Sequence, residues 1–129
     1  MKSGVVAGAG AGVVGGIVGL VFGVIGSQMG LYRLSPLPIT YLVSTAMVLI
    51  VIFGAIFGAI YVKFYDAIPG KGVSKGLYFG LMIWLINSIA PGAHLGIHSM
   101  EFNIAIRLVF VYFFVWISYG PVLGVLYKK

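Results

Sequence analysis

Four long apolar runs alternate with three short polar stretches along this chain. The runs cover residues 4–31, 39–62, 73–90 and 104–126, and each is close in length to the roughly 20 residues that cross a bilayer as a helix. The pattern predicts an all-α integral membrane protein with four transmembrane helices. Residues 1–129 are expected to form one transmembrane domain.

Helix-breaking residues mark the polar stretches. Pro36 and Pro38 separate the first two runs, because proline lacks a backbone donor and biases its predecessor away from helix. The second connection contains Pro69-Gly70, a typical turn sequence. Pro91 is expected to end the third run, and the segment 91–103 to lie along the membrane surface as a short helix.

Glycines recur every three or four residues in the first run, so they line one face of the predicted helix. A second pattern, Gly-x-x-x-Gly-x-x-Tyr-x-Lys, occurs at 54–63 and again at 120–129. Small-residue faces let membrane helices approach closely. We therefore expect the first helix to be the most enclosed one. The glycines predicted to mediate helix packing are Gly8, Gly12, Gly16, Gly19, Gly23, Gly54, Gly58, Gly76, Gly80, Gly120 and Gly124.

The chain also contains a candidate internal repeat. Gly120 follows Gly54 by 66 residues, and Gly76 follows Gly8 by 68. These offsets predict two tandem helical hairpins, of residues 1–64 and 70–129, related by an axis along the membrane normal. The alternative is that any glycine-rich membrane helix with terminal anchors shows the same motif, so a true duplication stays open at this level.

Composition supports the membrane assignment and orients it. Charged residues make up 8% of the chain, against roughly a quarter in soluble domains. The formal charge of +6 is dispersed between the apolar runs, so no nucleic-acid partner is expected. Six lysines lie near the two termini and the second connection, which places both termini in the cytoplasm by the positive-inside rule. The residues expected to anchor the helices at this interface are Tyr61, Lys63, Tyr127 and Lys129.

Four segments carry a family resemblance: Phe-Gly-Ala-Ile-Tyr at 57–61, Ile-Pro-Gly at 68–70, the stretch 75–85, and the ending at 119–127. Together they resemble an uncharacterised group of small four-span prokaryotic membrane proteins, over about the last two thirds of the chain. We expect the plasma membrane of a prokaryote as the location, and the resemblance itself implies only the four-span topology. It implies no activity.

The glycine stripe also resembles the proteolipid ring subunits of rotary ATPases. Those rings need a carboxylate at the middle of the membrane. In this chain Asp66 falls in a connection and Glu101 lies outside the fourth run. A proton-carrying rotor is therefore not expected.

One polar cluster has the composition of a metal site. Spacings of four and three would put His94, His98 and Glu101 on one face of a helix, where they could bind zinc or copper with a further ligand from water or a second chain. Two histidines and one acid in a connection are more often solvated or interfacial groups, and a second interpretation of the histidine pair is a pH-sensitive contact. No other cofactor is expected, and the absence of cysteine excludes thiolate ligands.

These patterns support three functional hypotheses. The first is a structural, assembly or partner-binding role, in which the glycine faces contact further copies or a larger membrane complex within the lipid. The alternative is a homo-oligomeric channel or facilitator for a small solute, lined by Ser44, Thr45, Asn87 and Ser118. The second alternative is metal binding at the external histidines. No catalytic signature is present, so an enzyme is not expected.

Overall fold

The computed structural model describes residues 2–33 and 38–128, and these residues form helices and short connections without strands. The elements are α1 (Lys2–Gln28), α2 (Ile39–Lys63), α3 (Val73–Trp84), a π-helical turn η1 (Leu85–Ile89), α4 (Ala90–His98) and α5 (Phe102–Leu126). Four helical stretches in this part of the chain are long and apolar enough to cross a membrane. The prediction of an all-α fold with four membrane-spanning helices is confirmed. Pro36, which was expected to help separate the first two helices, lies outside the described residues.

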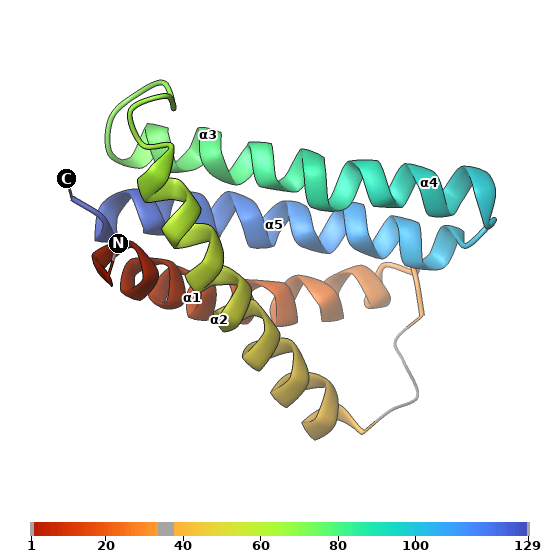
Figure 1. Cartoon of the computed structure of the whole chain (residues 1–129). Coiled ribbons are helices and arrows are strands. Elements are labelled where there is room, and N and C mark those ends of the chain that lie inside the picture. The colour runs from red at the N-terminus through yellow and green to blue at the C-terminus, as the bar shows by residue number, and fades with distance from the viewer. Residues whose placement is uncertain (1, 34–37, 129) are drawn as a thin grey trace.

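The third span is longer than predicted, because its helix does not end at Pro91. The elements α3, η1 and α4 form one continuous stretch, Val73–His98 (Figure 1). At the end of η1 the backbone N–H of Ala90 donates to the carbonyl of Leu85, five residues earlier. This wider turn accommodates a proline ring that would otherwise clash with the carbonyl four residues before it. The segment 91–98 is therefore the end of the third span and not a separate surface helix.

Glycines stand where the two helices of each hairpin cross. In the first hairpin, a Cβ atom added to Gly8 would lie closer than 3.0 Å to backbone atoms of Gly54 and Gly58. In the second hairpin, a Cβ on Gly76 would lie equally close to Gly120 and Gly124. Backbone therefore meets backbone in both crossings, which no larger residue would permit.

The two crossings correspond at the repeat offsets. Gly58 lies against the carbonyl of Gly4 in the first hairpin, and Gly124 lies against that of Gly72 in the second. The hairpins then join through α1 and α5, which pack on each other (Figure 1). A buried hydrogen bond of 2.7 Å from the Tyr119 hydroxyl to the Gly54 carbonyl links α5 to α2.

The most enclosed span is α5 and not α1, contrary to the prediction. In an apolar 18-residue window of each helix, 39% of α5 is buried, compared with 28% of α1. The reason is that α5 contacts α1, α3 and α4, whereas α1 uses its glycine face for α2 and α5 and exposes large residues such as Val6, Ile17 and Val21.

Two of the predicted interface anchors are buried. Tyr61 is fully buried and Tyr127 is nearly so, and their rings pack edge to face with centroids 5.8 Å apart. Tyr65 packs against both rings, and the buried Lys75 donates a hydrogen bond of 2.5 Å to its carbonyl. The equivalent ends of the two hairpins meet here, so the tyrosines cover each other and not the membrane surface. Lys63 is exposed as expected, and Lys129 lies outside the described residues.

The crossings give a direct test of the packing. We expect Gly120→Ala to destabilise the protein by about 1–3 kcal/mol, because the added methyl overlaps the Gly76 backbone. Gly23→Ala is the matched control, since nothing lies within 4 Å of a Cβ there, and it should change stability by about 0.5 kcal/mol or less. The unfolding midpoint in SDS, followed by circular dichroism, measures both. Equal effects of the two substitutions would contradict the close approach at Gly120.

Candidate functional site

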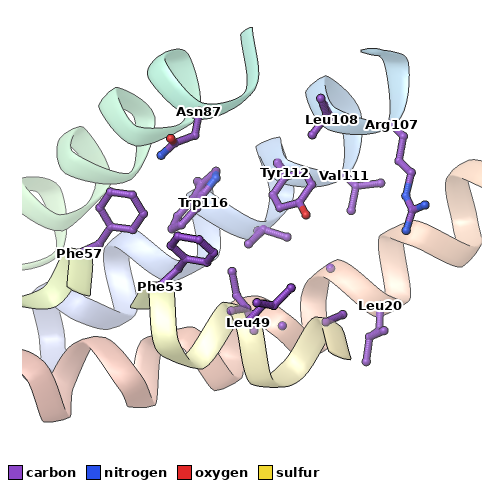
Figure 2. A pocket seen from close by; sticks show the side chains of 15 residues that line it. Leu20, Leu49, Phe53, Phe57, Asn87, Arg107, Leu108, Val111, Tyr112 and Trp116 are labelled. Atoms are coloured by element: carbon purple, nitrogen blue, oxygen red, sulfur yellow. The ribbon is translucent and has the colours of Figure 1, made fainter. Parts of the chain in front are cut away.

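A cavity of about 340 Å³ lies where α2 diverges from the other spans (Figure 1). Figure 1 shows the N-terminal turns of α2 standing away from the other helices. The cavity lies inside this opening and draws its lining from α1, α2, η1 and α5 (Figure 2). Its size falls within the range of about 300–1,000 Å³ of small-molecule sites. The lining residues are Gly16, Gly19, Leu20, Ala46, Leu49, Ile50, Phe53, Phe57, Asn87, Arg107, Leu108, Val111, Tyr112, Val115 and Trp116.

Most of this lining is apolar. Leu49 and Phe53 reach the cavity from α2, and both side chains are about half exposed. Phe57 packs edge to face on Trp116 of α5, with ring centroids 5.3 Å apart. On the α1 side Gly16 and Gly19 add no bulk, so Val115 forms part of the wall there. The cavity therefore suits hydrocarbon over most of its surface.

Four lining residues carry polar atoms: Asn87, Arg107, Tyr112 and Trp116. Figure 2 shows Asn87 reaching down from the third span on the side where Trp116 stands. Trp116 is 4% exposed, and its indole Nε1 has no hydrogen-bond partner among the described residues. Asn87 belongs to the π-helical turn, a local irregularity that is frequent at functional sites.

Arg107 is the only cation among the described residues that line the cavity, and none of those lining residues is acidic. The chain's two acidic residues lie elsewhere: Asp66 follows α2 at the opposite end of the bundle, and Glu101 is exposed just before α5. Arg107 also lies close enough to Tyr32 to act on it electrostatically. Burial raises the pKa of the Tyr32 hydroxyl above its usual value of 10.0, and the Arg107 charge opposes this rise.

Within one chain, the residues predicted to line an oligomeric channel do not come together, and the channel itself stays a prediction. Ser44 donates to the carbonyl of Thr40 at 2.7 Å, and Ser118 donates to that of Phe114 at 2.8 Å, so each hydroxyl is satisfied by its own helix. Thr45 is exposed on α2, and of the four predicted residues only Asn87 lines the cavity. Arg107 and Trp116 were not proposed from the sequence, because neither stands in a motif. The signal for Arg107 was its position inside an apolar run.

The predicted packing glycines divide into three groups. Those at the hairpin crossings, Gly8, Gly12, Gly54, Gly58, Gly76, Gly80, Gly120 and Gly124, contact the opposite helix of the same hairpin. Gly16 and Gly19 contact neighbouring side chains and also line the cavity, whereas Gly23 has nothing within 4 Å of a Cβ. Most of the glycine surface assigned to partners is thus used within one chain.

The predicted metal ligands are only partly brought together. The rings of His94 and His98 lie on successive turns of α4 with centroids 4.8 Å apart, and both are exposed. Glu101 lies beyond the end of α4. Residues 2–33 and 38–128 contain no group of three or more histidine or acidic side chains placed to hold a metal ion. Zinc or copper binding stays an untested hypothesis.

Comparisons with known proteins leave the site to be judged on its geometry. The chain matches no protein-family model, no curated protein and no solved structure. The membrane-spanning fold and the cavity between its helices are therefore the features from which a function is argued.

A metal titration tests the histidine pair. A stable zinc site usually needs at least three protein ligands, and α4 offers two imidazoles. We therefore expect calorimetric titration of the purified protein with zinc chloride to show no stoichiometric binding at micromolar concentration. The His94→Ala/His98→Ala variant serves as the control and should give the same trace. A one-to-one binding curve that disappears in this variant would establish the metal site.

Proposed function

We propose that the protein binds an amphipathic molecule dissolved in the membrane, which enters the cavity between α2 and α5 from the lipid phase. The observation that carries this proposal is the cavity itself: apolar walls joined to a few polar groups at the opening of a helix bundle. Such a combination is the usual form of a small-molecule site. This is the solute-binding hypothesis, with its site moved from an oligomeric pore to the interior of one chain.

The weak attachment of α2 supports entry from the side. Only 11% of its apolar 18-residue window is buried, which is the lowest share among the four spans. Its glycine crossing on α1 extends as far as Gly16, which contacts Met47 and Ile50. The turns before Met47 are mostly exposed. A guest in the bilayer thus meets an opening between helices and needs no aqueous route.

The bilayer itself is part of the proposal. The lysines near the termini and the second connection favour an orientation with both termini in the cytoplasm, and we take the membrane to be the plasma membrane of a prokaryote. The cavity then faces the outer half of the plasma membrane, because Arg107 lies near the beginning of α5, the end remote from the lysines. A role in holding or passing on a lipid-soluble compound follows from this position.

Assembly with a second copy or a larger membrane complex is the second candidate. The exposed face of α2 favours it, since Val48, Ile52 and Ile56 are at least half exposed in one chain. This role would use side chains of α2, because most of the predicted packing glycines already contact each other inside the chain. It ranks second because an exposed apolar helix face is also what contact with lipid requires.

Filling the cavity tests the binding role. Ala46 lines the cavity, so Ala46→Phe places a ring inside it, whereas Val48→Phe enlarges an exposed residue on the same helix that lies outside the lining. The probe is phosphatidylcholine with a photoactivatable diazirine in one acyl chain. Cross-links mapped by mass spectrometry should concentrate on cavity residues such as Phe53 and Trp116. The yield of these cross-links should fall about tenfold or more in Ala46→Phe, which corresponds to a loss of about 1.4 kcal/mol of binding free energy.

The control variant Val48→Phe should leave the cross-linking yield unchanged. Both variants should keep the wild-type unfolding midpoint, because neither change lies at a glycine crossing. Labelling spread evenly over outward-facing residues, with no response to Ala46→Phe, would remove the binding proposal and leave assembly as the leading function.

A further inference from the structure

We infer that the occupant of the cavity is an anionic phospholipid, whose phosphate contacts Arg107 while one acyl chain fills the apolar space toward Trp116. This inference rests on the proposed binding function and adds the chemistry of the head group. It depends on three observations: the charge of the cavity, the excess of donors over acceptors in its lining, and the depth of Arg107 along α5.

The charge of the cavity favours an anion. Arg107 brings a guanidinium that stays protonated in proteins, and no acidic residue lines the cavity with it. A charge beside apolar walls in a membrane is costly unless it meets a counter-charge or water. Guanidinium matches the phosphate group in geometry as well as in charge, because it can donate two parallel hydrogen bonds.

The hydrogen-bond donors of the lining also favour an anionic guest. The Arg107 guanidinium and the Trp116 indole can donate hydrogen bonds but cannot accept them. The Trp116 Nε1 is buried, so Arg107 is the lining residue whose accessible side-chain groups donate without accepting. A guest with an acceptor oxygen at the depth of Arg107, such as a phosphate group, complements the guanidinium, whereas a guest that carries mainly donors does not.

The depth of Arg107 suits a bilayer lipid. It is the sixth residue of α5, which places it about 7–8 Å below the start of that helix at about 1.5 Å per residue. Trp116 stands nine residues farther along α5, about 13 Å deeper by the same rise. The head group of a phospholipid at the membrane surface can therefore reach Arg107 while its acyl chain extends along α5.

Tryptophan fluorescence can measure this occupancy, because Trp84 and Trp116 are the chain's two tryptophans. In the Trp84→Phe protein, Trp116 alone reports on the cavity. The protein is reconstituted into phosphatidylcholine vesicles that contain increasing fractions of lipid with brominated acyl chains, which quench tryptophan on contact. The brominated lipid is phosphatidylglycerol, phosphatidylcholine or a free fatty acid. Trp116→Phe, which leaves Trp84 outside the cavity, is the control for bulk lipid contact.

We expect brominated phosphatidylglycerol to occupy the site about fivefold better than brominated phosphatidylcholine, the factor typical of one basic residue near anionic lipid. Arg107→Gln should abolish this preference, whereas Arg107→Lys should retain most of it. The preference should also weaken at high salt, and the Trp116→Phe control should show none.

Each result that would contradict the inference has a different consequence. Saturable quenching of Trp116 that is equal for both phospholipids would overturn the anionic head group but keep the binding function. A phosphatidylglycerol preference that survives Arg107→Gln would overturn the role of Arg107. Stronger binding of the free fatty acid would overturn the choice of a phospholipid. Quenching of Trp116 no greater than that of Trp84 in the control would remove the proposed function as well.

Discussion

The close approach of backbone to backbone at the glycine crossings is the constraint on which the rest of this structure depends. Lipid tails are as apolar as the side chains, so burial of apolar surface does not drive membrane helices together, and contact must come from close packing. At Gly8 and Gly54, and again at Gly76 and Gly120, the absence of side chains lets the opposite backbones touch. Each hairpin is thereby fixed at one point, and the position of every other residue depends on how its helices continue beyond that point.

The two hairpins share this crossing and differ in the contacts that their helices make farther along. In the second, Gly92 of α4 lies close to Val109 and Ala105, and Trp84 donates to the Val109 carbonyl at 3.1 Å, so α4 stays on α5. In the first, α2 leaves α1 before Met47, and among the described residues no glycine contact holds its N-terminal turns. The cavity is the volume opened by this difference. The helices of the two hairpins thus cross in the same way and then continue differently, and this difference produces a site that neither hairpin contains alone.

The sequence predicts the spans and the glycine faces because both depend on local patterns. Apolar run length sets the four helices, and glycine spacing sets the faces on which they cross. The continuation of the helix through Pro91 could not be predicted, because it requires a π-helical turn that carries no sequence signature here. The burial of Tyr61 and Tyr127 depends on which helix ends meet in space. The cavity depends on a divergence of α2, and its polar residues, Arg107 and Trp116, are spread over one helix without a motif.

The apolar side chains exposed by this divergence bear on the stability of the fold as well as on its function. Phe53 and Leu49 of α2 would lose packing contacts if the cavity stayed empty, because dispersion is lost wherever a surface has no neighbouring atoms. In a bilayer the nearest material that can supply those contacts is an acyl chain. A bound lipid would then stabilise the first hairpin in the way that Gly92 and Trp84 stabilise the second. The guest would thus substitute for the intramolecular contacts that α2 lacks, so binding a lipid and holding α2 in place are two consequences of the same geometry.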